Sequence, residues 1–301
     1  MKTFSFKTIL VLVCMAGSVS SMPAALKVVT LHPLMTDLAK RVGGKQVEVD
    51  GLMAPGEDIH RFSPSSSDMA KASAADVVLV SGKGLEIYLP KLQKSLPKSA
   101  RVVQAGNAVR SIKVSASSSL FVCCPAHAAG NIDPHWWHSV SGMKGVAEYV
   151  AKEFGKADPG GADAYEANAI AYGNQLDELL EWAKHEVAKV PRSRRVLVTA
   201  HAAYAYFCKE FGFQSIPVAG LSGESVSSKY LAETIAQIKK HEVVAVFPEE
   251  NASQKALDTI VSATGVKKGG VLIADGSVQG VTTYDAFIRH NISAVVKALG
   301  N

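Results

Sequence analysis

Cysteine is scarce in this chain, with four residues at positions 14, 123, 124 and 208 among 301. Cys123 and Cys124 are adjacent, but no second cluster of the Cys-x-x-Cys kind accompanies them, so the signal for a thiolate metal site is weak. A disulfide from one of this pair to Cys208 and free thiols are the alternatives that the sequence leaves open.

Several catalytic and binding motifs are also absent. The chain has no His-Glu-x-x-His helix, no Gly-x-Ser-x-Gly turn and no phosphate-binding loop of the Walker type. Basic residues are scattered, and the cluster of Arg192, Arg194 and Arg195 has no aromatic residues between its members. These absences disfavour a zinc protease, a serine hydrolase, a P-loop nucleotide-binding protein and a nucleic-acid-binding protein.

Long hydrophobic runs are missing except near the N-terminus. Residues 1–25 combine Lys2 and Lys7, an apolar run over 9–16 and then small residues, which predicts a cleaved secretory signal peptide. The run is shorter than the ~20 residues that a membrane-spanning helix needs. We therefore expect a periplasmic or otherwise extracytoplasmic protein. Its net charge falls from +5 to +3 (30 basic minus 27 acidic residues) once the two lysines of the leader are removed.

The mature chain alternates short β-rich runs with amphipathic stretches. Residues 77–80 are four consecutive apolar residues typical of a buried strand, and residues 162–190 have a helical pattern of apolar positions. The alternation predicts an α/β protein with parallel sheets flanked by helices. We expect an N-terminal α/β lobe over 26–157, one long linker helix over 158–191 and a C-terminal α/β lobe over 192–301.

Four residues are candidate metal ligands: His60, His135, His201 and Asp275. His201 follows a predicted strand over 195–199, and Asp275 follows a predicted strand over 271–274. His60 lies in the loop after a β-rich run, and His135 lies in the loop before a helix. In open α/β sheets ligands bind beyond the carboxyl ends of the strands, so two residues from each lobe can converge there. The sequence therefore predicts one metal site between the lobes.

The donor types of this predicted site favour zinc. Three imidazoles and one carboxylate suit Zn²⁺, a borderline cation that is usually bound tetrahedrally by nitrogen, sulfur and oxygen. Mn²⁺ and Mg²⁺ prefer oxygen-rich shells, so a carboxylate in place of His201 would favour manganese. We expect Zn²⁺ as the bound solute, with Mn²⁺ second.

Longer motifs around these residues carry a family resemblance. Residues 55–68, beginning Pro-Gly-Glu-Asp-Ile-His, the stretch 75–86, Asp-Pro-His-Trp at 133–136 and Thr-Ala-His-Ala-Ala-Tyr at 199–204 resemble the zinc and manganese solute-binding proteins of metal ABC importers. The resemblance covers essentially the whole mature chain. It implies two α/β lobes joined by a rigid linker helix, a metal held between them, and delivery to a membrane ABC permease. It also implies the same four ligands: His60, His135, His201 and Asp275.

Further residues are candidates for accessory or supporting roles. His138 lies three residues beyond a predicted ligand, so it is either an accessory ligand or an exposed residue. His32 follows the first predicted strand and either orients a ligand or is an ordinary loop residue. Glu249 and Glu250 follow another strand, where they are candidates for a supporting role or for the carboxylate ligand itself.

Two neighbouring features complete these expectations. Trp136 and Trp137 are expected to pack between the lobes and shield the ion from water. The loop over 115–131 lacks a histidine-rich tract and offers Cys123, Cys124 and His127, so transient metal capture by this loop is a hypothesis.

Proteins with other functions could use the same four predicted ligands. A zinc-dependent hydrolase needs an open coordination position for water, which four protein ligands do not leave. A metal-binding adhesin or chaperone differs only in its partner. We predict a monomeric binding protein that is not an enzyme. Its expected partner is a membrane permease, with a metallochaperone as a second candidate and no nucleic acid.

Overall fold

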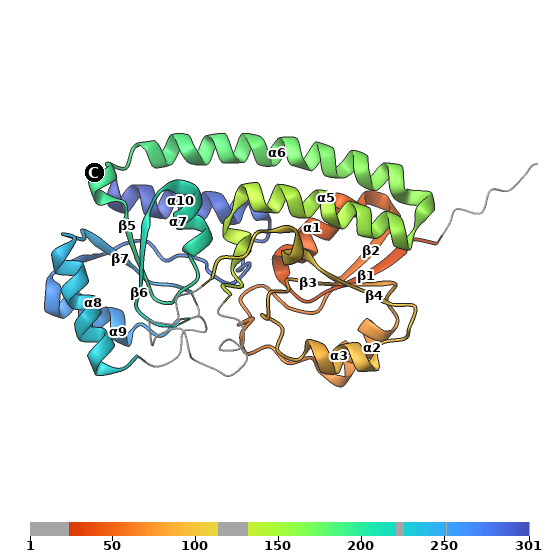
Figure 1. Cartoon of the computed structure of the whole chain (residues 1–301), viewed down its shortest axis with the longest axis horizontal. Coiled ribbons are helices and arrows are strands. Elements are labelled where there is room, and N and C mark those ends of the chain that lie inside the picture. The colour runs from red at the N-terminus through yellow and green to blue at the C-terminus, as the bar shows by residue number, and fades with distance from the viewer. Residues whose placement is uncertain (1–23, 114–131, 221–225, 251, 301) are drawn as a thin grey trace, which may run out of the picture.

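The computed structural model describes residues 24–113, 132–220, 226–250 and 252–300, and it shows two α/β lobes beneath one long helix (Figure 1). Helix α6 (Ala162–Ala188) is 27 residues long and runs over both lobes. Each lobe contains a sheet of four parallel strands. The predicted fold class, two parallel-sheet lobes flanked by helices and joined by one long helix, is confirmed.

The N-terminal sheet has the strand order β2-β1-β3-β4. Its strands are β1 (Leu26–Thr30), β2 (Val47–Gly51), β3 (Val77–Val80) and β4 (Arg101–Gln104). Its helices are α1 (Pro33–Gly43) and α5 (Val140–Ala157) on the α6 side, with α2 (Ser66–Ser73) and α3 (Leu89–Ser95) on the other side (Figure 1). Strand β3 is buried on both faces because successive side chains, such as Leu79 and Val80, enter different cores.

The C-terminal sheet has the order β6-β5-β7-β8 and repeats this topology. Its strands are β5 (Val196–Thr199), β6 (Gln214–Pro217), β7 (Ala245–Phe247) and β8 (Lys267–Lys268). Its helices are α7 (Ala205–Phe211) and α10 (Tyr284–Leu299) on the α6 side, with α8 (Ser228–Lys240) and α9 (Lys255–Thr264) on the other (Figure 1). Short 3₁₀ turns occupy Gly44–Gln46, Ala105–Ala108, Trp136–His138, Pro159–Gly161 and Arg192–Arg194. In each sheet the first and third strands along the chain lie side by side at the centre.

The largest hydrophobic core is shared by the two lobes. It contains Leu34 of α1, Val146 of α5, Leu179 of α6, Phe207 of α7 and Ile288 of α10. The cores on the opposite faces of the two sheets are smaller and separate. Separating the lobes on the α6 side would expose the shared apolar surface to water, so packing along this side holds the two sheets in a fixed relation.

The strand predicted over 271–274 is wrong. In the described structure this segment makes one parallel bridge, between Glu249 and Leu272, and the strand beside β7 is β8 instead. A Cβ atom on Gly269 would lie 2.5 Å from the ring of Phe247. Glycine therefore lets the backbone pass close to this ring. The regular pairing with β7 ends here, and beyond it the chain meets the sheet again only at the Leu272 bridge.

Helix α3 and strand β4 were not predicted. Helix α3 is only seven residues long, and most of its residues are exposed. Strand β4 is at the edge of its sheet, and only Val103 of its four residues is fully buried. Elements this short show too little of their period to be recognised from pattern alone.

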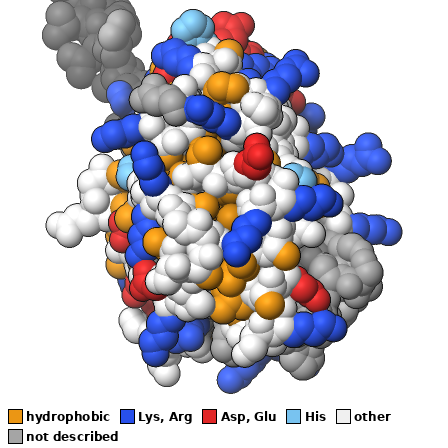
Figure 2. All heavy atoms as spheres, turned by 90° about the vertical axis from the view of Figure 1, so that its left-hand side faces the viewer, with side chains coloured by type: hydrophobic (Ala, Val, Ile, Leu, Met, Phe, Trp, Pro, Cys, Tyr) orange, Lys and Arg blue, Asp and Glu red, His pale blue; other side chains and the backbone are white. Residues whose placement is uncertain are grey.

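The surface of the C-terminal end of the molecule is chemically mixed. Figure 2 shows lysine and arginine side chains spread over this face, between acidic, hydrophobic and other residues. Within the described ranges, no helix combines the length and the apolar character needed to cross a membrane.

Candidate metal centre

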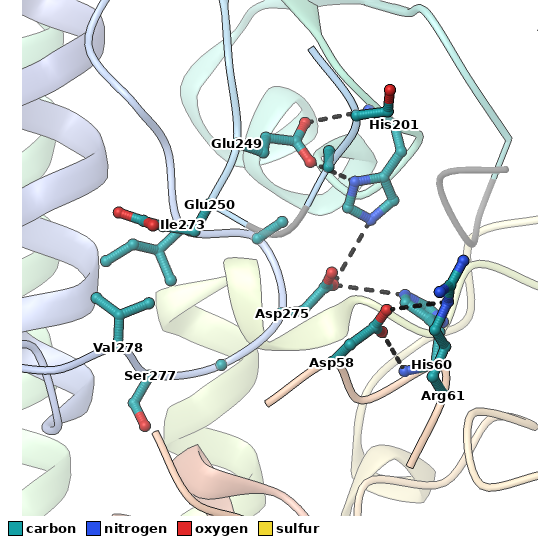
Figure 3. Close-up of a pocket in the computed structure, with 14 residues that line it drawn as sticks. Asp58, His60, Arg61, His201, Glu249, Glu250, Ile273, Asp275, Ser277 and Val278 are labelled. Atoms are coloured by element: carbon teal, nitrogen blue, oxygen red, sulfur yellow. Dashed lines mark hydrogen bonds and ion pairs between the residues drawn. The ribbon is translucent and has the colours of Figure 1, made fainter. Parts of the chain in front are cut away.

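The four predicted ligands come together between the two sheets. One donor atom from each of His60, His135, His201 and Asp275 lies within 4.8 Å of all the others. Asp275 Oδ1 is 3.5 Å from His60 Nε2, 3.6 Å from His135 Nε2 and 3.5 Å from His201 Nε2. The Nε2 atoms of His60 and His135 are 3.2 Å apart. Figure 3 shows His60 and His201 directed toward the carboxylate of Asp275.

These separations match the size of a tetrahedral ion. Zinc bonds of ~2.0–2.1 Å place the ligand atoms of a tetrahedron ~3.3–3.4 Å apart. The four separations given above run from 3.2 to 3.6 Å. The arrangement can therefore hold a small divalent cation with shifts of a few tenths of an ångström.

His60 and His135 are held by the same local pattern. His60 lies in the loop between β2 and α2, and its backbone N–H donates to Asp58 Oδ1 at 2.9 Å. His135 precedes the turn over Trp136–His138, and its backbone N–H donates to Asp133 Oδ1 at 2.8 Å. In both cases an aspartate two residues before the histidine fixes its backbone, as in an Asx turn.

Asp133 also orients the ring of His135. Its Oδ1 lies 2.8 Å from His135 Nδ1, so Nδ1 carries the proton and Nε2 is left to bind a metal. Burial raises the pKa of Asp133 to about 7, although the hydrogen bond from His135 acts in the opposite direction.

His201 follows β5 and is held by Glu249, which follows β7. Glu249 Oε1 accepts the backbone N–H of His201 at 3.1 Å, and Glu249 Oε2 bonds to His201 Nδ1. Burial opposes protonation of this imidazole, but the carboxylates of Glu249 and Asp275 outweigh it and hold the pKa of His201 well above 6.5. The central strands of the C-terminal sheet thus supply one candidate ligand and its carboxylate partner.

Asp275 lies in the irregular segment that follows β8. Helix α10 fixes the backbone here, because Asn291 accepts the N–H of Ile273 at 2.9 Å and donates to its carbonyl at 2.8 Å. Burial would raise the pKa of the Asp275 carboxyl, but His201 and His60 hold it well below its usual 3.8. Without a metal, a proton on His201 balances this carboxylate.

Glu249 and Glu250 are not in the cluster of four. Glu249 is buried against His201, as described above. Glu250 is exposed and lines the same pocket as His201 and Asp275, on the side away from Asp58 and Arg61 in Figure 3. This arrangement favours Asp275 as the carboxylate donor and leaves the supporting role to Glu249.

His138 and His32 are both fully buried, so of the two alternatives for His138 the exposed one is wrong. His138 Nε2 bonds to the carbonyl of Ala274 at 2.9 Å and is outside the cluster. His32 caps α1 by accepting the N–H of Leu34 at 3.1 Å, and its ring packs on Trp137 at a centroid distance of 4.5 Å. Trp137 is fully buried and donates to Ala274 of the other lobe, so it lies between the lobes as predicted. Trp136 is equally buried, but its indole N–H donates to Ser81 of its own lobe.

The two lobes repeat a short motif at their first strands. Residues 28–32 are Val-Val-Thr-Leu-His and residues 197–201 are Leu-Val-Thr-Ala-His, so a histidine follows the first strand at the same spacing in each sheet. In the N-terminal lobe this histidine caps a helix, whereas in the C-terminal lobe it faces the cluster. The equivalent position in the two lobes therefore holds a helix-capping histidine in one and a candidate metal ligand in the other.

The cysteine expectations are tested only at Cys208. This residue is a buried free thiol, so it forms no disulfide in the described structure. Burial raises the pKa of its thiol to about 12, which makes it a poor nucleophile at neutral pH. Cys123, Cys124 and His127 lie outside the described residues, as does most of the predicted leader.

Two parallel-sheet lobes with three imidazoles and a carboxylate converging between them define a metal-binding solute-binding protein. The sequence belongs to the family of zinc-uptake complex component A, periplasmic, which it matches over residues 28–298. Members of this family are solute-binding proteins and not enzymes, and the membrane partner of such a protein is an ABC permease.

Individual relatives differ in the metal for which they are named. The chain is 34% identical to the manganese-binding lipoprotein MntA of Bacillus subtilis over 288 residues, covering 91% of this chain and 90% of the relative. It is 32% identical to the zinc-binding protein TroA of Treponema pallidum over 286 residues, covering 90% and 88%. The solved structure of TroA superimposes with a TM-score of 0.80 at 28% identity, covering 92% of this chain and 100% of that one.

Proposed function

We propose that the protein captures one Zn²⁺ per chain with His60, His135, His201 and Asp275 and delivers it to a membrane ABC permease. The observation that supports this most strongly is the spacing of the donor atoms, because Asp275 Oδ1 lies 3.5 to 3.6 Å from three imidazole nitrogens. Four donors in a tetrahedron leave no open position for a reactive water, which suits capture.

Zinc is favoured over manganese by the donor set. Three neutral nitrogens and one carboxylate oxygen resemble zinc sites more than the oxygen-rich shells of manganese. Asp133 and Glu249 contact the Nδ1 atoms of two of the histidines, which makes the opposite nitrogens better donors. The named relatives include both manganese-binding and zinc-binding proteins, so the preference rests on the donors of this chain.

Calorimetric titration of the metal-free protein tests the proposed site. We expect one zinc per chain, and we expect His60→Ala, His135→Ala and His201→Ala each to weaken binding by at least about tenfold, because each removes a ligand. His185→Ala is the control, since His185 is exposed on α6. Unchanged affinity in the three ligand variants would refute the site.

Competition between zinc and manganese tests the choice of ion. The Irving–Williams order predicts that this nitrogen-rich site prefers zinc by at least about tenfold when both ions are offered together. Metal analysis of the protein after dialysis against an equimolar mixture measures the ratio directly. Equal or greater occupancy by manganese would overturn zinc as the proposed solute while leaving the site in place.

We also propose that the protein is exported from the cytoplasm and acts as a monomer. The apolar run near the N-terminus predicts a cleaved leader, and the matched family is described as periplasmic. N-terminal sequencing of the protein recovered from an extracytoplasmic fraction is expected to begin near residue 26. Recovery of a cytoplasmic chain that retains residue 1 would contradict export.

A further inference from the structure

The carbonyl of Ala274 accepts two side-chain hydrogen bonds from the segment that carries His135. Trp137 Nε1 donates to it at 2.8 Å, and His138 donates to it from Nε2 at 2.9 Å. Because a carbonyl only accepts, the hydrogen of His138 must be on Nε2. Both donors are fully buried, and the acceptor belongs to the residue directly before Asp275.

Packing holds the two donors in this orientation. The ring of His138 lies between Tyr204 and Phe287, at centroid distances of 4.4 and 5.2 Å. The ring of Trp137 lies against His135 at 5.2 Å, and its own carbonyl accepts the hydroxyl of Tyr284 at 2.9 Å. These contacts keep His138 from turning toward the metal cluster, so it serves as a donor and not as a ligand.

The segment around Asp275 depends on such contacts because it lacks a strand ladder. Residues 271–274 make a single bridge to the sheet, and Ile273 is fixed by Asn291. The carbonyl of Ala274, held by Trp137 and His138, is then the last hydrogen-bonded backbone group before the side chain of Asp275. Gly276 follows with a φ of +127°, a conformation that side chains other than glycine rarely adopt.

We propose that Trp137 and His138 are positioning residues that set where the carboxylate of Asp275 stands relative to His135. This inference rests on the proposed function, because it assigns these residues to the same metal site. Two candidate ligands from different lobes, His135 and Asp275, are thereby tied into one unit. Loss of either donor frees the Asp275 segment to move away from the metal.

Substitutions at His138 test the hydrogen bond separately from the packing. His138→Phe keeps a ring between Tyr204 and Phe287 but removes the donor. His138→Gln places an amide N–H at about the reach of Nε2, whereas His138→Asn ends one bond short of it. Each amide also carries a carbonyl oxygen and a second N–H. The oxygen has a counterpart in His138 Nδ1, which is already a buried acceptor without a hydrogen-bond partner in the described part of the chain, and the second N–H is shared by both amide variants.

The first measurement is the rate of zinc release into excess chromogenic chelator. One net hydrogen bond is worth about 0.5–1.5 kcal/mol, so His138→Phe and His138→Asn are expected to speed release about two- to tenfold. His138→Gln is expected to restore most of the wild-type rate. Tyr204→Phe is the control, since it removes a polar atom next to the same ring without removing a hydrogen bond of the described structure.

A double-mutant cycle with Asp275→Ala asks whether His138 acts through Asp275. If it does, His138→Phe changes the release rate less than about twofold once Asp275 is absent, because the coupled effect has already been lost. An equal effect in both backgrounds, or an equal effect of the Gln and Phe variants, would overturn the inference.

Amide hydrogen exchange in the metal-free protein separates failure of this inference from failure of the proposed function. The N–H groups of Leu272 and Ile273 bond to the Pro248 carbonyl and to Asn291, and we expect both to exchange faster in His138→Phe and normally in His138→Gln. If the wild type bound no zinc but this pattern appeared, the proposed function would fail while the tie between the segments stood. If the wild type bound zinc but His138→Phe did not speed exchange at Leu272 and Ile273, this inference would fail while the proposed function stood.

Discussion

Nδ1 of His135 lies 2.8 Å from Oδ1 of Asp133, and the backbone N–H of His135 donates to the same oxygen. One carboxylate atom therefore fixes both the backbone and the ring of a candidate ligand. We expect Asp133→Ala to weaken zinc binding about tenfold to hundredfold, because partners of this kind orient the ligand and raise its basicity. Titration in the presence of a competing chelator measures the change.

Asp133→Asn is the matched control for that variant. Its side-chain oxygen can still accept both hydrogen bonds, but it carries no negative charge. An affinity between those of the wild type and Asp133→Ala would separate the orienting effect from the charge. If Asp133→Ala bound zinc as tightly as the wild type, the supporting role of this aspartate would be refuted.

Zinc binding is expected to release protons at neutral pH. The pKa of His201 is held well above 6.5 in the metal-free protein, so its imidazole is protonated at pH 7 and must lose that proton to bind a metal. Affinity should therefore fall as the pH is lowered and rise until the pH passes this raised pKa. Calorimetry in buffers of different ionisation enthalpy should count about one proton per zinc at pH 7.

Glu249→Gln checks the origin of this proton. Removing the carboxylate beside Nδ1 should bring the pKa of His201 down, so fewer protons are released at pH 7. The same proton count in Glu249→Gln and in the wild type would show that another group supplies it.

The sequence predicts the architecture more completely than it predicts the residues that hold the candidate ligands in place. Buried strands such as β3 and the 27-residue helix α6 repeat their patterns long enough to be recognised. The four clustered residues were also predicted, because three of them are histidines flanked by distinctive motifs. The Asp-x-His spacing at Asp58 and Asp133 was a usable local signal for the backbone contacts, although it was not used.

Other features depend on contacts between distant parts of the chain. The bond from His138 to Ala274 joins segments that no local pattern connects, so this histidine was predicted to be either a ligand or exposed. The segment over 271–274 is apolar enough to predict a strand, but the regular pairing with β7 ends at Lys268, and within this segment only Leu272 forms a bridge to the sheet. Tertiary packing decides such cases, and periodicity does not contain that information.

Zinc should stabilise the folded protein. A ligand that binds only the folded state adds about 2.7 kcal/mol at a free concentration one hundred times its Kd, which corresponds to several degrees in Tm for a chain of this size. Calorimetric melting with and without zinc measures the shift. His135→Ala should lose most of it, and an equal shift in that variant would locate the stabilising zinc elsewhere.

The stability of the metal-free protein should also depend on pH through Glu86, which lies outside the metal cluster. Burial raises the pKa of this carboxyl from 4.5 to about 7, although it accepts the N–H groups of Ser81 and Gly82. The pKa of Glu86 is higher in the folded protein than in the unfolded chain, so its protonated form favours folding. This contribution to stability is fully present below pH 4.5 and is lost as the pH rises through about 7.

Denaturant unfolding in excess chelator tests this dependence. The free energy of unfolding of the wild type should fall relative to Glu86→Gln as the pH rises from about 5 to 8, because the glutamine cannot ionise. Parallel profiles for the two proteins over this range would contradict the raised pKa.

The most direct test of the central claim is the anomalous scattering of a crystal of the zinc-loaded protein, recorded on both sides of the zinc absorption edge. We predict one peak between the lobes, within about 2.0–2.2 Å of the Nε2 atoms of His60, His135 and His201 and of a carboxylate oxygen of Asp275. A peak ligated by Glu249 or Glu250 in place of Asp275, or a peak outside the cluster, would contradict the account.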